Sequence, residues 1–458
     1  MSDLLNMDAL ELSRLIAARK VTAVELMRAT LSRINAVNGA VNAIVSLRDR
    51  EALMGEARLA DAMAPVGWLH GIPFAVKDLV AVRGVRSTSG SPLFANLVPK
   101  ADDGLARRLR AAGAIIIGKT NVPAFGLGSH SSNPIFGVTK TPYGLDRTAG
   151  GSSGGAGAAL AARIVSVADG SDMMGSLRNP AAWNNVYGFR PTTGIVPTDA
   201  GENVFQHQLS TNGPMARSVA DMEALLTTLT DGGYRGGANP KSAPRIGWLA
   251  DWGGAYPMET GVLDLAESAI ATMTDLGWKV EPVAPPVAAD VLWESWTALR
   301  SFAVMLNLGS HWRGPATRAI LNPQALWEVE QGFAQTGDRV QRAAEIRLDW
   351  LRRLEDMFTR YDALMLPSTQ CWPFPSDWDW PRTIGDTEMD TYHRWMECVV
   401  PASLAGAPAL AIPAGFGAAG LPGGVQLIGP RGGDAALMAL GRVWHDATGW
   451  PQVRPPVI

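Results

Sequence analysis

The amino-acid sequence predicts an α/β protein, built on a large mixed, mostly parallel twisted sheet with helices covering both faces. Three short apolar runs, over residues 74–80, 114–117 and 164–168, have the length and composition of buried strands. Helix-like segments over residues 105–112 and 156–163 alternate with them. Strands that alternate with helices in this way are typical of sheets that are buried on both faces.

The sequence also predicts the elements that flank this pattern. Thr22 and Glu25 have the spacing of a capping box, in which both side chains satisfy free N–H groups at the start of a helix. An amphipathic helix over residues 26–34 is therefore expected to follow. Downstream we expect a strand over 245–249, a helix over 261–276, a tryptophan-rich helical region over 289–308 and 324–360, and a last helix from Asp434.

The chain is predicted to fold as one compact domain over residues 1–458. A hydrophobic content of 47% in 458 residues is enough to fill a large core. Residues 67–220 contain the motifs that suggest chemistry, and residues 242–400 are predicted to form a variable helical cover that shapes a substrate pocket. The tryptophans of this cover are candidates for an apolar channel, although tryptophans in helices are more often core: Trp293, Trp296, Trp312 and Trp327.

Composition argues against several classes of partner. A net charge of −3 gives no basic surface for nucleic acid or for an anionic membrane. The longest uncharged stretch, over residues 399–430, is interrupted by prolines and glycines, so it predicts short buried strands and no bilayer span. Two cysteines in so long a chain suit a reducing compartment, and the acidic first residues do not resemble a signal peptide. We expect a cytoplasmic protein with a small neutral or mildly charged substrate.

Two serines in glycine-rich turns are the most informative feature of the sequence. Residues 150–155 are Gly-Gly-Ser-Ser-Gly-Gly, and Ser176 follows Ser152 by 24 residues within the segment 172–178. Upstream, Lys77 lies in an apolar run. A serine nucleophile needs a neighbouring base and N–H donors for the oxyanion, and burial lowers the pKa of a lysine toward that of a useful base. The pattern indicates a Ser/Ser/Lys hydrolase.

These motifs resemble those of the amidase signature hydrolases. The hallmark of that family is a GGSSGG segment and, 24 residues after its first serine, the nucleophile of a D-x-G-G-S-x-R-x-P segment. Further matching segments occur in the family order at residues 71–73, 118–121, 179–181 and 188–192, with a weaker match at 424–429. The strong resemblance covers residues 67–220, and several motifs in one order are more specific than any one alone. It implies the amidase signature fold.

The resemblance implies a role for each matching residue. Ser176 is the expected nucleophile, Ser152 the serine that relays its proton, and Lys77 the base; the Gly151–Ser152 peptide bond is expected to be cis. The backbone N–H groups expected to form the oxyanion hole are those of Met173, Met174, Gly175 and Ser176. Ser153, Asp172 and Arg178 are expected to hold this loop in place. Gly126, Gly128, Gly150 and Gly151 are expected to contact substrate, because the family's loop equivalent to 124–132 flanks the acyl pocket.

The sequence departs from the family pattern in two places. Met174 stands where the family usually has glycine, which changes the shape of the pocket and is compatible with the chemistry if φ at this residue is negative. Trp183-Asn184-Asn185 stands where members commonly show a Cys-Gly pair, and we interpret it as altered packing below the site.

The resemblance implies an amidase, a hydrolase of C–N bonds other than peptide bonds that acts on linear amides. The expected substrate is a carboxylic amide or a related aryl amide, carbamate or ester, which is split to carboxylate and amine through a Ser176 acyl-enzyme. Neither a metal nor an organic cofactor is implied. A homodimer is compatible with the sequence, which does not name the particular substrate.

Alternatives remain open at this stage. The same family supplies the amidase subunit of multi-chain amidotransferases, which requires partner chains. The segment 151–155 also matches the G-x-S-x-G turn of α/β-hydrolases, with Ser153 as the nucleophile and Asp434 and His445 in the right chain order. A non-catalytic binding protein on the same scaffold is a further alternative, since a glycine-rich turn before a helix also binds anions. Lys119 is left unassigned.

Overall fold

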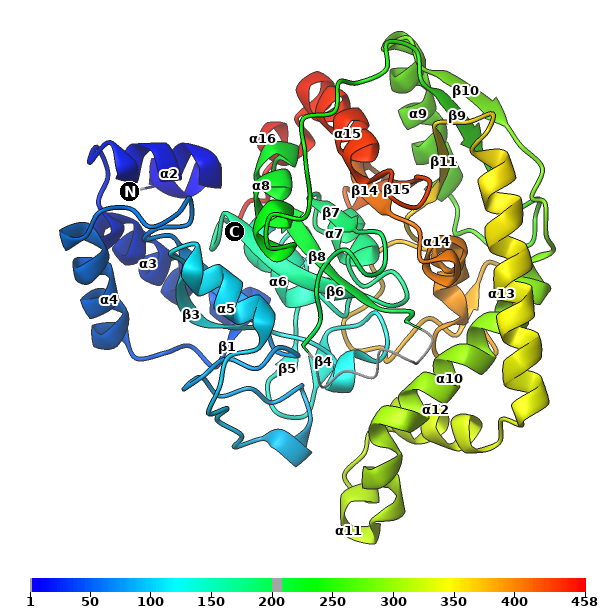
Figure 1. The fold of residues 1–458 in the computed structure, drawn as a ribbon, viewed down its shortest axis with the longest axis horizontal. Helices are drawn as coiled ribbons and strands as arrows, with labels where there is room; N and C mark the ends of the chain where they lie inside the picture. Colours follow the sequence, from blue (N-terminus) through cyan, green and yellow to red (C-terminus); the bar gives the residue numbers. More distant parts are fainter. Residues whose placement is uncertain (1, 200–207) are drawn as a thin grey trace.

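The computed structural model describes residues 2–199 and 208–458. Its largest sheet has eight strands in the order β10–β9–β11–β15–β14–β7–β8–β6, with helices on both faces (Figure 1). The strands are β6 (Val167–Asp172), β7 (Tyr187–Arg190), β8 (Thr211–Ala216), β9 (Arg245–Trp248), β10 (Lys279–Pro282), β11 (Ala363–Pro367), β14 (Ala409–Phe416) and β15 (Pro422–Ile428). The predicted α/β class with a mixed, helix-covered sheet is confirmed.

The share of parallel pairs in this sheet is smaller than the sequence predicts. Strand β9 runs parallel to both β10 and β11, whereas the pairs from β11 through β15, β14, β7 and β8 to β6 are antiparallel. Alternating strands and helices do not encode strand direction. A short hairpin joins β14 to β15, and such a connection forces an antiparallel pair.

A smaller sheet continues the large one on the side of β6. Its strands have the order β1 (Ile44–Val45), β3 (Ile115–Thr120) and β2 (Pro73–Lys77), with β2 and β3 parallel. Strand β2 lies beside β6, and the backbone N–H of Lys77 donates to Oδ1 of Asp169 at 3.0 Å. This contact brings the ends of β2 and β6 to one edge of the sheet. Two separate hairpins pair β4 (Ser132–Asn133) with β5 (Gly137–Val138), and β12 (Thr383–Ile384) with β13 (Thr387–Glu388).

The helices follow the predicted segments closely in most of the chain. Thr22 and Glu25 form the predicted capping box at the start of α3. The predicted helix over 324–360 is two helices, because Thr336 caps a new start at 337 by accepting from the N–H of Arg339. The α-helices are α1 (Ser2–Asn6), α2 (Ala9–Ala17), α3 (Ala23–Val41), α4 (Arg50–Ala62), α5 (Gly104–Ala111), α6 (Gly154–Ala161), α7 (Arg178–Trp183), α8 (Val219–Leu229), α9 (Val262–Asp275), α10 (Ala289–Arg313), α11 (Pro315–Arg318), α12 (Pro323–Phe333), α13 (Gly337–Met357), α14 (Val400–Ala405), α15 (Asp434–Thr448) and α16 (Trp450–Val453); the 3-10 helices are η1 (Pro92–Phe94), η2 (Ala124–Gly126) and η3 (Arg394–Val399).

Apolar side chains fill the layers on each face of the large sheet. Alternate residues of β14 contribute to different cores: Leu410 and Ile412 pack with α8 and α15 on one face, while Ala409 packs with α13 and α14 on the other. This alternation is the pattern expected of a strand that is covered on both sides. None of the helices in the described part of the chain has the length and apolar character needed to cross a membrane.

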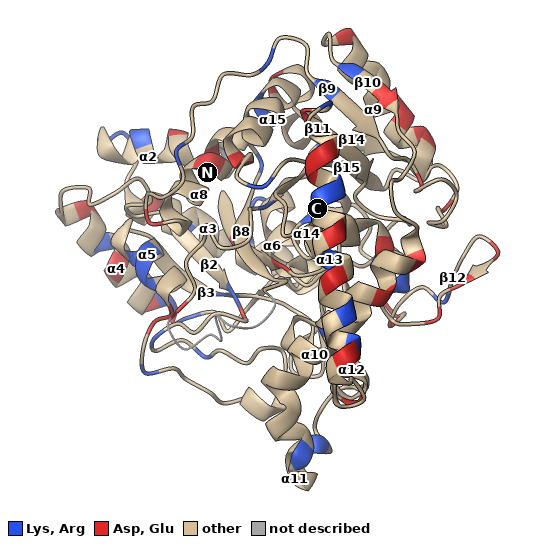
Figure 2. Ribbon diagram, turned by 45° about the vertical axis from the view of Figure 1, so that its right-hand side comes forward, with Lys and Arg blue, Asp and Glu red and all other residues tan. Residues whose placement is uncertain are grey.

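The region 242–400 contributes to the sheet as well as to the cover. It supplies β9, β10 and β11 in addition to α9–α13. Helices α10, α11 and α12 extend away from the sheet at one end of the molecule (Figure 1). Helix α13 carries acidic and basic residues along its outer side (Figure 2), whereas Trp350 and Leu354 of the same helix are buried against the core. Residues 200–207, part of the predicted motif region 67–220, lie outside the described residues.

Candidate active site

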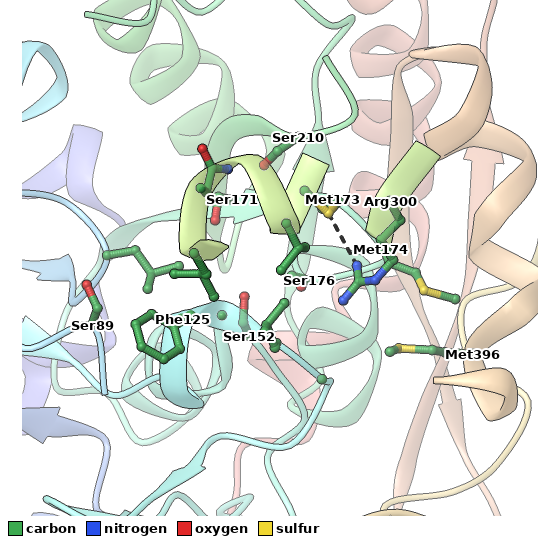
Figure 3. Close-up of a pocket in the computed structure, with 17 residues that line it drawn as sticks. Ser89, Phe125, Ser152, Ser171, Met173, Met174, Ser176, Ser210, Arg300 and Met396 are labelled. Carbon is green, nitrogen blue, oxygen red and sulfur yellow. Dashed lines mark hydrogen bonds between the residues drawn. The ribbon is translucent and has the colours of Figure 1, made fainter. Parts of the chain in front are cut away.

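The sequence motifs meet at one edge of the sheet, where β2 and β6 end. Lys77 is the last residue of β2, and Asp172 is the last residue of β6. Ser152 lies in the turn before α6, and Ser176 lies in the turn between β6 and α7. Figure 3 shows both serines among the residues that line one cavity. Strand ends followed by helix starts commonly form the ligand site of an open α/β sheet.

The side-chain amine of Lys77 is surrounded by hydroxyl groups. Its Nζ lies 2.8 Å from the Oγ atoms of both Ser152 and Ser153, and 2.9 Å from the Oγ of Ser171. A hydroxyl accepts from an ammonium and donates to a neutral amine, so this arrangement suits both protonation states. Lys77 is 1% exposed, and burial lowers the pKa of its amine to about 7, against the opposing effect of two buried aspartates. The amine therefore titrates near neutral pH.

The predicted relay runs from Ser176 through Ser152 to Lys77, and a hydrogen bond joins the second of these two pairs. Ser152 contacts Lys77, whereas within residues 2–199 and 208–458 no hydrogen bond joins the hydroxyls of Ser152 and Ser176. The backbone ties the two turns together, because the N–H of Ser153 donates to the carbonyl oxygen of Ser176 at 3.2 Å. Both hydroxyls also line the same cavity. Hydrogen bonds between catalytic groups often tighten only in the complex with substrate.

The turn before Ser152 is closely packed. The Gly151–Ser152 peptide bond is cis, as the family resemblance implies. Ser129 fixes the turn, because its Oγ donates to the carbonyl oxygen of Gly151 and accepts from the N–H of the same residue. A Cβ at Gly151 would lie 2.9 Å from the backbone nitrogen of His130, so the turn requires glycine at this position.

Asp172 anchors the loop that carries Ser176. Its carboxylate accepts from the N–H groups of Gly175 and Leu177, at 2.9 and 3.2 Å, and from Nε and Nη2 of Arg178, each at 3.0 Å. Burial alone would raise the pKa of Asp172, but the charges of Arg178 and Arg190 and the donated hydrogen bonds outweigh it and hold the pKa well below its usual range. The predicted supports Asp172 and Arg178 thus form one fully buried ion pair beneath the loop.

The predicted oxyanion donors differ in their availability. The N–H of Gly175 already donates to Asp172. Those of Met173, Met174 and Ser176 donate to no acceptor in the described part of the chain. Met174 does not have a positive φ, so its replacement of the family glycine leaves the loop backbone unstrained, whereas Gly175 has φ +77°. Three backbone donors therefore remain for a developing oxyanion.

A cavity of about 280 Å³ opens in front of these groups (Figure 3). The predicted substrate contacts Gly126 and Gly128 line it, but Gly150 and Gly151 do not, because they lie in the packed turn behind Ser152. The lining residues are Leu79, Ser89, Phe125, Gly126, Leu127, Gly128, Ser152, Ser171, Met173, Met174, Ser176, Ser210, Arg300, Val304, Asn307, Leu308 and Met396.

The tryptophans considered for an apolar channel do not line this cavity. Trp296 is fully buried, and its indole N–H lies 3.2 Å from the sulfur of Met174. Trp183, in the segment that departs from the family, stacks on Trp395 with ring centroids 5.6 Å apart, and Asn184 donates to the carbonyl oxygen of Ala149 at 2.8 Å. These side chains pack below the site, as the interpretation of that segment predicted.

Sequence reasoning missed two polar groups of the site. Ser171 contacts Lys77 and lines the cavity, and its only local signal is its place directly before Asp172 at a strand end. Arg300 reaches the cavity from α10, and no local motif marks it. Lys119, left unassigned from the sequence, is fully buried and donates to the carbonyl oxygens of Lys77 and Val80. It therefore supports the end of β2.

The alternative triad is not assembled. Ser153 is fully buried against Lys77, and Asp434 accepts from the backbone N–H and the hydroxyl of Thr192 at 2.8 and 2.5 Å. His445 has its Nδ1 3.2 Å from the hydroxyl of Tyr187. The G-x-S-x-G interpretation with Ser153 as nucleophile is therefore wrong, because a nucleophile, its base and the acid must contact one another. Across the described residues, no group of three His, Cys, Asp or Glu side chains is placed to hold a metal ion.

The chain is similar to known proteins over nearly its whole length. The family model described as Amidase matches residues 25–438. A curated relative from Chloroflexus aurantiacus, the A-type subunit of glutamyl-tRNA(Gln) amidotransferase, is 32% identical over 485 residues, which cover 97% of each chain. Among solved structures, a bacterial aryl acylamidase of the amidase signature family has a TM-score of 0.89 at 26% identity and covers 98% of this chain and 99% of its own. The corresponding glutamyl-tRNA(Gln) amidotransferase subunit from Thermotoga maritima has a TM-score of 0.73 at 26% identity, with coverages of 93% and 95%.

Proposed function

The chain belongs to the amidase family, and we propose that within this family of C–N hydrolases it is a free-standing amidase that splits the linear amide of a small molecule. The observation that carries the proposal is the contact of 2.8 Å between Nζ of Lys77 and Oγ of Ser152, with burial lowering the pKa of the amine to about 7. A general base works best when its pKa lies near the working pH.

The proposed reaction begins with a proton relay. The neutral amine of Lys77 takes the hydroxyl proton of Ser152 while Ser152 takes that of Ser176, and Oγ of Ser176 forms a bond to the carbonyl carbon. The N–H groups of Met173, Met174 and Ser176 stabilise the oxyanion. Removing one such donor typically costs about 10² to 10³ in rate, so these groups are central to the proposal.

The second half of the reaction reverses the relay. The ammonium of Lys77 returns its proton through Ser152 to the leaving nitrogen, the C–N bond breaks, and the amine departs. Water then adds to the acyl ester as the same relay removes its proton, and the carboxylate is released when Ser176 regains its hydrogen. Ser153 and Ser171 stay in contact with Nζ during these steps and stabilise both protonation states.

Two observations favour a free-standing enzyme over an amidotransferase subunit. The fold is closer to that of the aryl acylamidase than to that of the Thermotoga maritima subunit, with TM-scores of 0.89 and 0.73. The cavity walls include Leu79, Phe125, Leu127, Val304 and Leu308 and only one charged side chain among the described lining residues, which suits an apolar acyl or aryl group better than a free amino acid. The identity of 32% to a curated amidotransferase subunit keeps that role as the second candidate.

The test uses the chain purified alone. A panel of aliphatic amides, anilides, carbamates, esters and glutamine is assayed by kcat/KM, and Ser176→Ala and Lys77→Ala are each expected to remove nearly all turnover while the melting temperature stays close to that of the parent. Turnover of glutamine alone would favour the amidotransferase role. Full activity in Lys77→Ala would exclude the relay. Failure of an acylating probe to label Ser176 would favour a non-catalytic binding protein.

A further inference from the structure

Helix α10 presents two N–H donors to the loop that carries the nucleophile. The indole of Trp296 lies 3.2 Å from Sδ of Met174. Nη1 of Arg300 lies 3.3 Å from Sδ of Met173 (Figure 3). The two donors are four residues apart, so they project from the same face of the helix. A thioether sulfur is a weak acceptor, and for a guanidinium N–H it is a poor substitute for oxygen.

The rest of the Arg300 side chain is firmly held. Its Nε lies 2.5 Å from Oε1 of Glu328 on α12, and its Nη2 donates to the hydroxyl of Tyr392 at 2.8 Å. Tyr392 in turn donates to the same Glu328 oxygen at 2.6 Å. Arg300 is 3% exposed and Glu328 is fully buried, so this carboxylate neutralises the guanidinium without solvent. The contacts fix the plane of the guanidinium and leave Nη1 with a sulfur as its acceptor.

The position of Arg300 makes this donor relevant to substrate. Arg300 lines the same cavity as Ser152 and Ser176, and it is the one lining residue with a charged side chain in the described part of the chain. Val304 and Leu308 of the same helix line the cavity as apolar neighbours of Arg300, and Asn307 lines it as an uncharged polar one. Because the guanidinium is buried, a hydrogen bond from it to a substrate oxygen contributes more to the binding free energy than one made in water.

We propose that Arg300 determines specificity by donating from Nη1 to an uncharged carbonyl oxygen in the part of the substrate away from the scissile amide. That oxygen replaces the sulfur of Met173 as the acceptor. A carboxylate is disfavoured in the same position, because it would bring a second negative charge near the fully buried carboxylate of Glu328. The inference rests on the proposed amidase function and names its substrate class: amides with an apolar chain or ring that bears a second, neutral carbonyl group.

Matched pairs of substrates test the inference. Pentanamide is compared with 4-oxopentanamide, and hexanamide with its 4-oxo and 5-oxo derivatives, by kcat/KM for each member. The parent enzyme is expected to prefer at least one ketone by roughly tenfold to a hundredfold, the usual range for a hydrogen bond to a charged group. The monoamide of butanedioic acid, which has a carboxylate in that place, is expected to react more slowly than pentanamide.

Variants of Arg300 identify the donor. Arg300→Met is expected to reduce the ketone preference to about onefold, and Arg300→Lys to an intermediate value. Arg313→Met is the control, because Arg313 lies on α10 outside the cavity and is expected to leave the ratio unchanged. Since Arg300→Met leaves Glu328 buried without its partner, the double variant Arg300→Met/Glu328→Met replaces the whole ion pair and is expected to fold better than the single variant. Each variant is scored by the ratio of kcat/KM for the two substrates of a pair, so a loss of activity toward both substrates cancels.

The outcomes separate this inference from the proposed function. Turnover of all amides without a ketone preference, or a preference that survives in Arg300→Met, would overturn the inference and leave the amidase function standing. If the parent enzyme turns over none of these amides, dissociation constants for the same pairs are measured with Ser176→Ala. A ketone preference in binding that depends on Arg300 would then support the inference alone, and its absence would overturn it.

Discussion

The carboxylate of Asp169 accepts the backbone N–H of Lys77 at 3.0 Å, from a position where it is fully buried and its second oxygen has no partner among the described residues. Its negative charge favours the ammonium form of Lys77 and so raises the pKa of that amine. In Asp169→Asn the amide oxygen still accepts the N–H, but the charge is removed. We expect the pKa of Lys77 to fall, and the acid limb of the kcat/KM profile to move to lower pH.

We also expect a specific pH dependence of kcat/KM for the unmodified enzyme. Because the proposed reaction needs the neutral amine of Lys77, and burial lowers the pKa of that amine to about 7, kcat/KM is expected to rise about tenfold per pH unit below 7 and to level off above it. Initial rates between pH 5 and 9 on one neutral substrate measure this limb. A profile that is flat across pH 7 would contradict the assigned base, and Asp169→Asn compared with the parent shows whether the limb belongs to Lys77.

Ser171 is expected to act as a positioning residue for Lys77. Its hydroxyl lies 2.9 Å from Nζ and can be removed without leaving a charged partner alone, because Ser152 and Ser153 remain in contact with the amine. Ser171→Ala should lower kcat roughly tenfold, the equivalent of one hydrogen bond, and should change KM little. Ser171→Thr keeps the hydroxyl and should recover most of the loss. Equal losses in both variants would show that packing, and not the hydroxyl, is responsible.

Met174 is expected to stabilise the fold more than it contributes to chemistry. The side chain is 2% exposed and packs against Trp296, while the proposed oxyanion donor at this position is the backbone N–H. Met174→Ala should lower the free energy of unfolding by about 2 to 4 kcal/mol, the usual cost of a cavity, whereas Met174→Leu conserves volume and should cost less than about 1.5 kcal/mol. Urea denaturation measures both values. A Leu variant as unstable as the Ala variant would argue that the sulfur contact itself is needed.

The ionisation of Asp172 is expected to make the stability of the protein depend on pH in the acid range. Its pKa is held well below the usual range in the folded protein, so its ionised form contributes stability at every pH above the unfolded value of about 3.9. That contribution is lost as the pH falls through and below this value. Asp172→Asn leaves Arg178 and Arg190 buried without their anion and should cost about 3 to 5 kcal/mol at pH 7. The variant should also show a weaker dependence of stability on pH between 5 and 2, measured by urea denaturation at each pH.

The sequence is most informative where chemistry requires particular residues at fixed spacing. The pairing of Lys77 with Ser152, the buried Asp172–Arg178 ion pair and the cis bond before Ser152 are all reachable from the motifs, because each depends on residues within the segment 67–220. The capping box at Thr22 can also be predicted from the sequence, because it depends on two residues that are three positions apart.

The features that sequence analysis missed depend on distant parts of the chain. Arg300 reaches the cavity only because α10 packs across the site, and nothing around residue 300 marks this. The antiparallel majority of the large sheet follows from how its strands connect, which periodicity does not record. The sequence predicts that Gly150 and Gly151 contact substrate, but packing explains both glycines: Ser129 and His130 approach Gly151 closely, and Gly150 has φ +76° and lies against Trp183 and Pro180.

The sulfurs of Met173 and Met174 link helix α10 to the loop that carries Ser176. Because Trp296 and Arg300 touch these two neighbours, any exchange of helix α10 for that of a relative also alters what holds the backbone around the reactive serine. A chimaera that takes helix α10 from a relative should therefore also take that relative's residues at positions 173 and 174. Recombination designs that exchange helix α10 separately from the loop that carries Ser176 would break the contacts between these two segments.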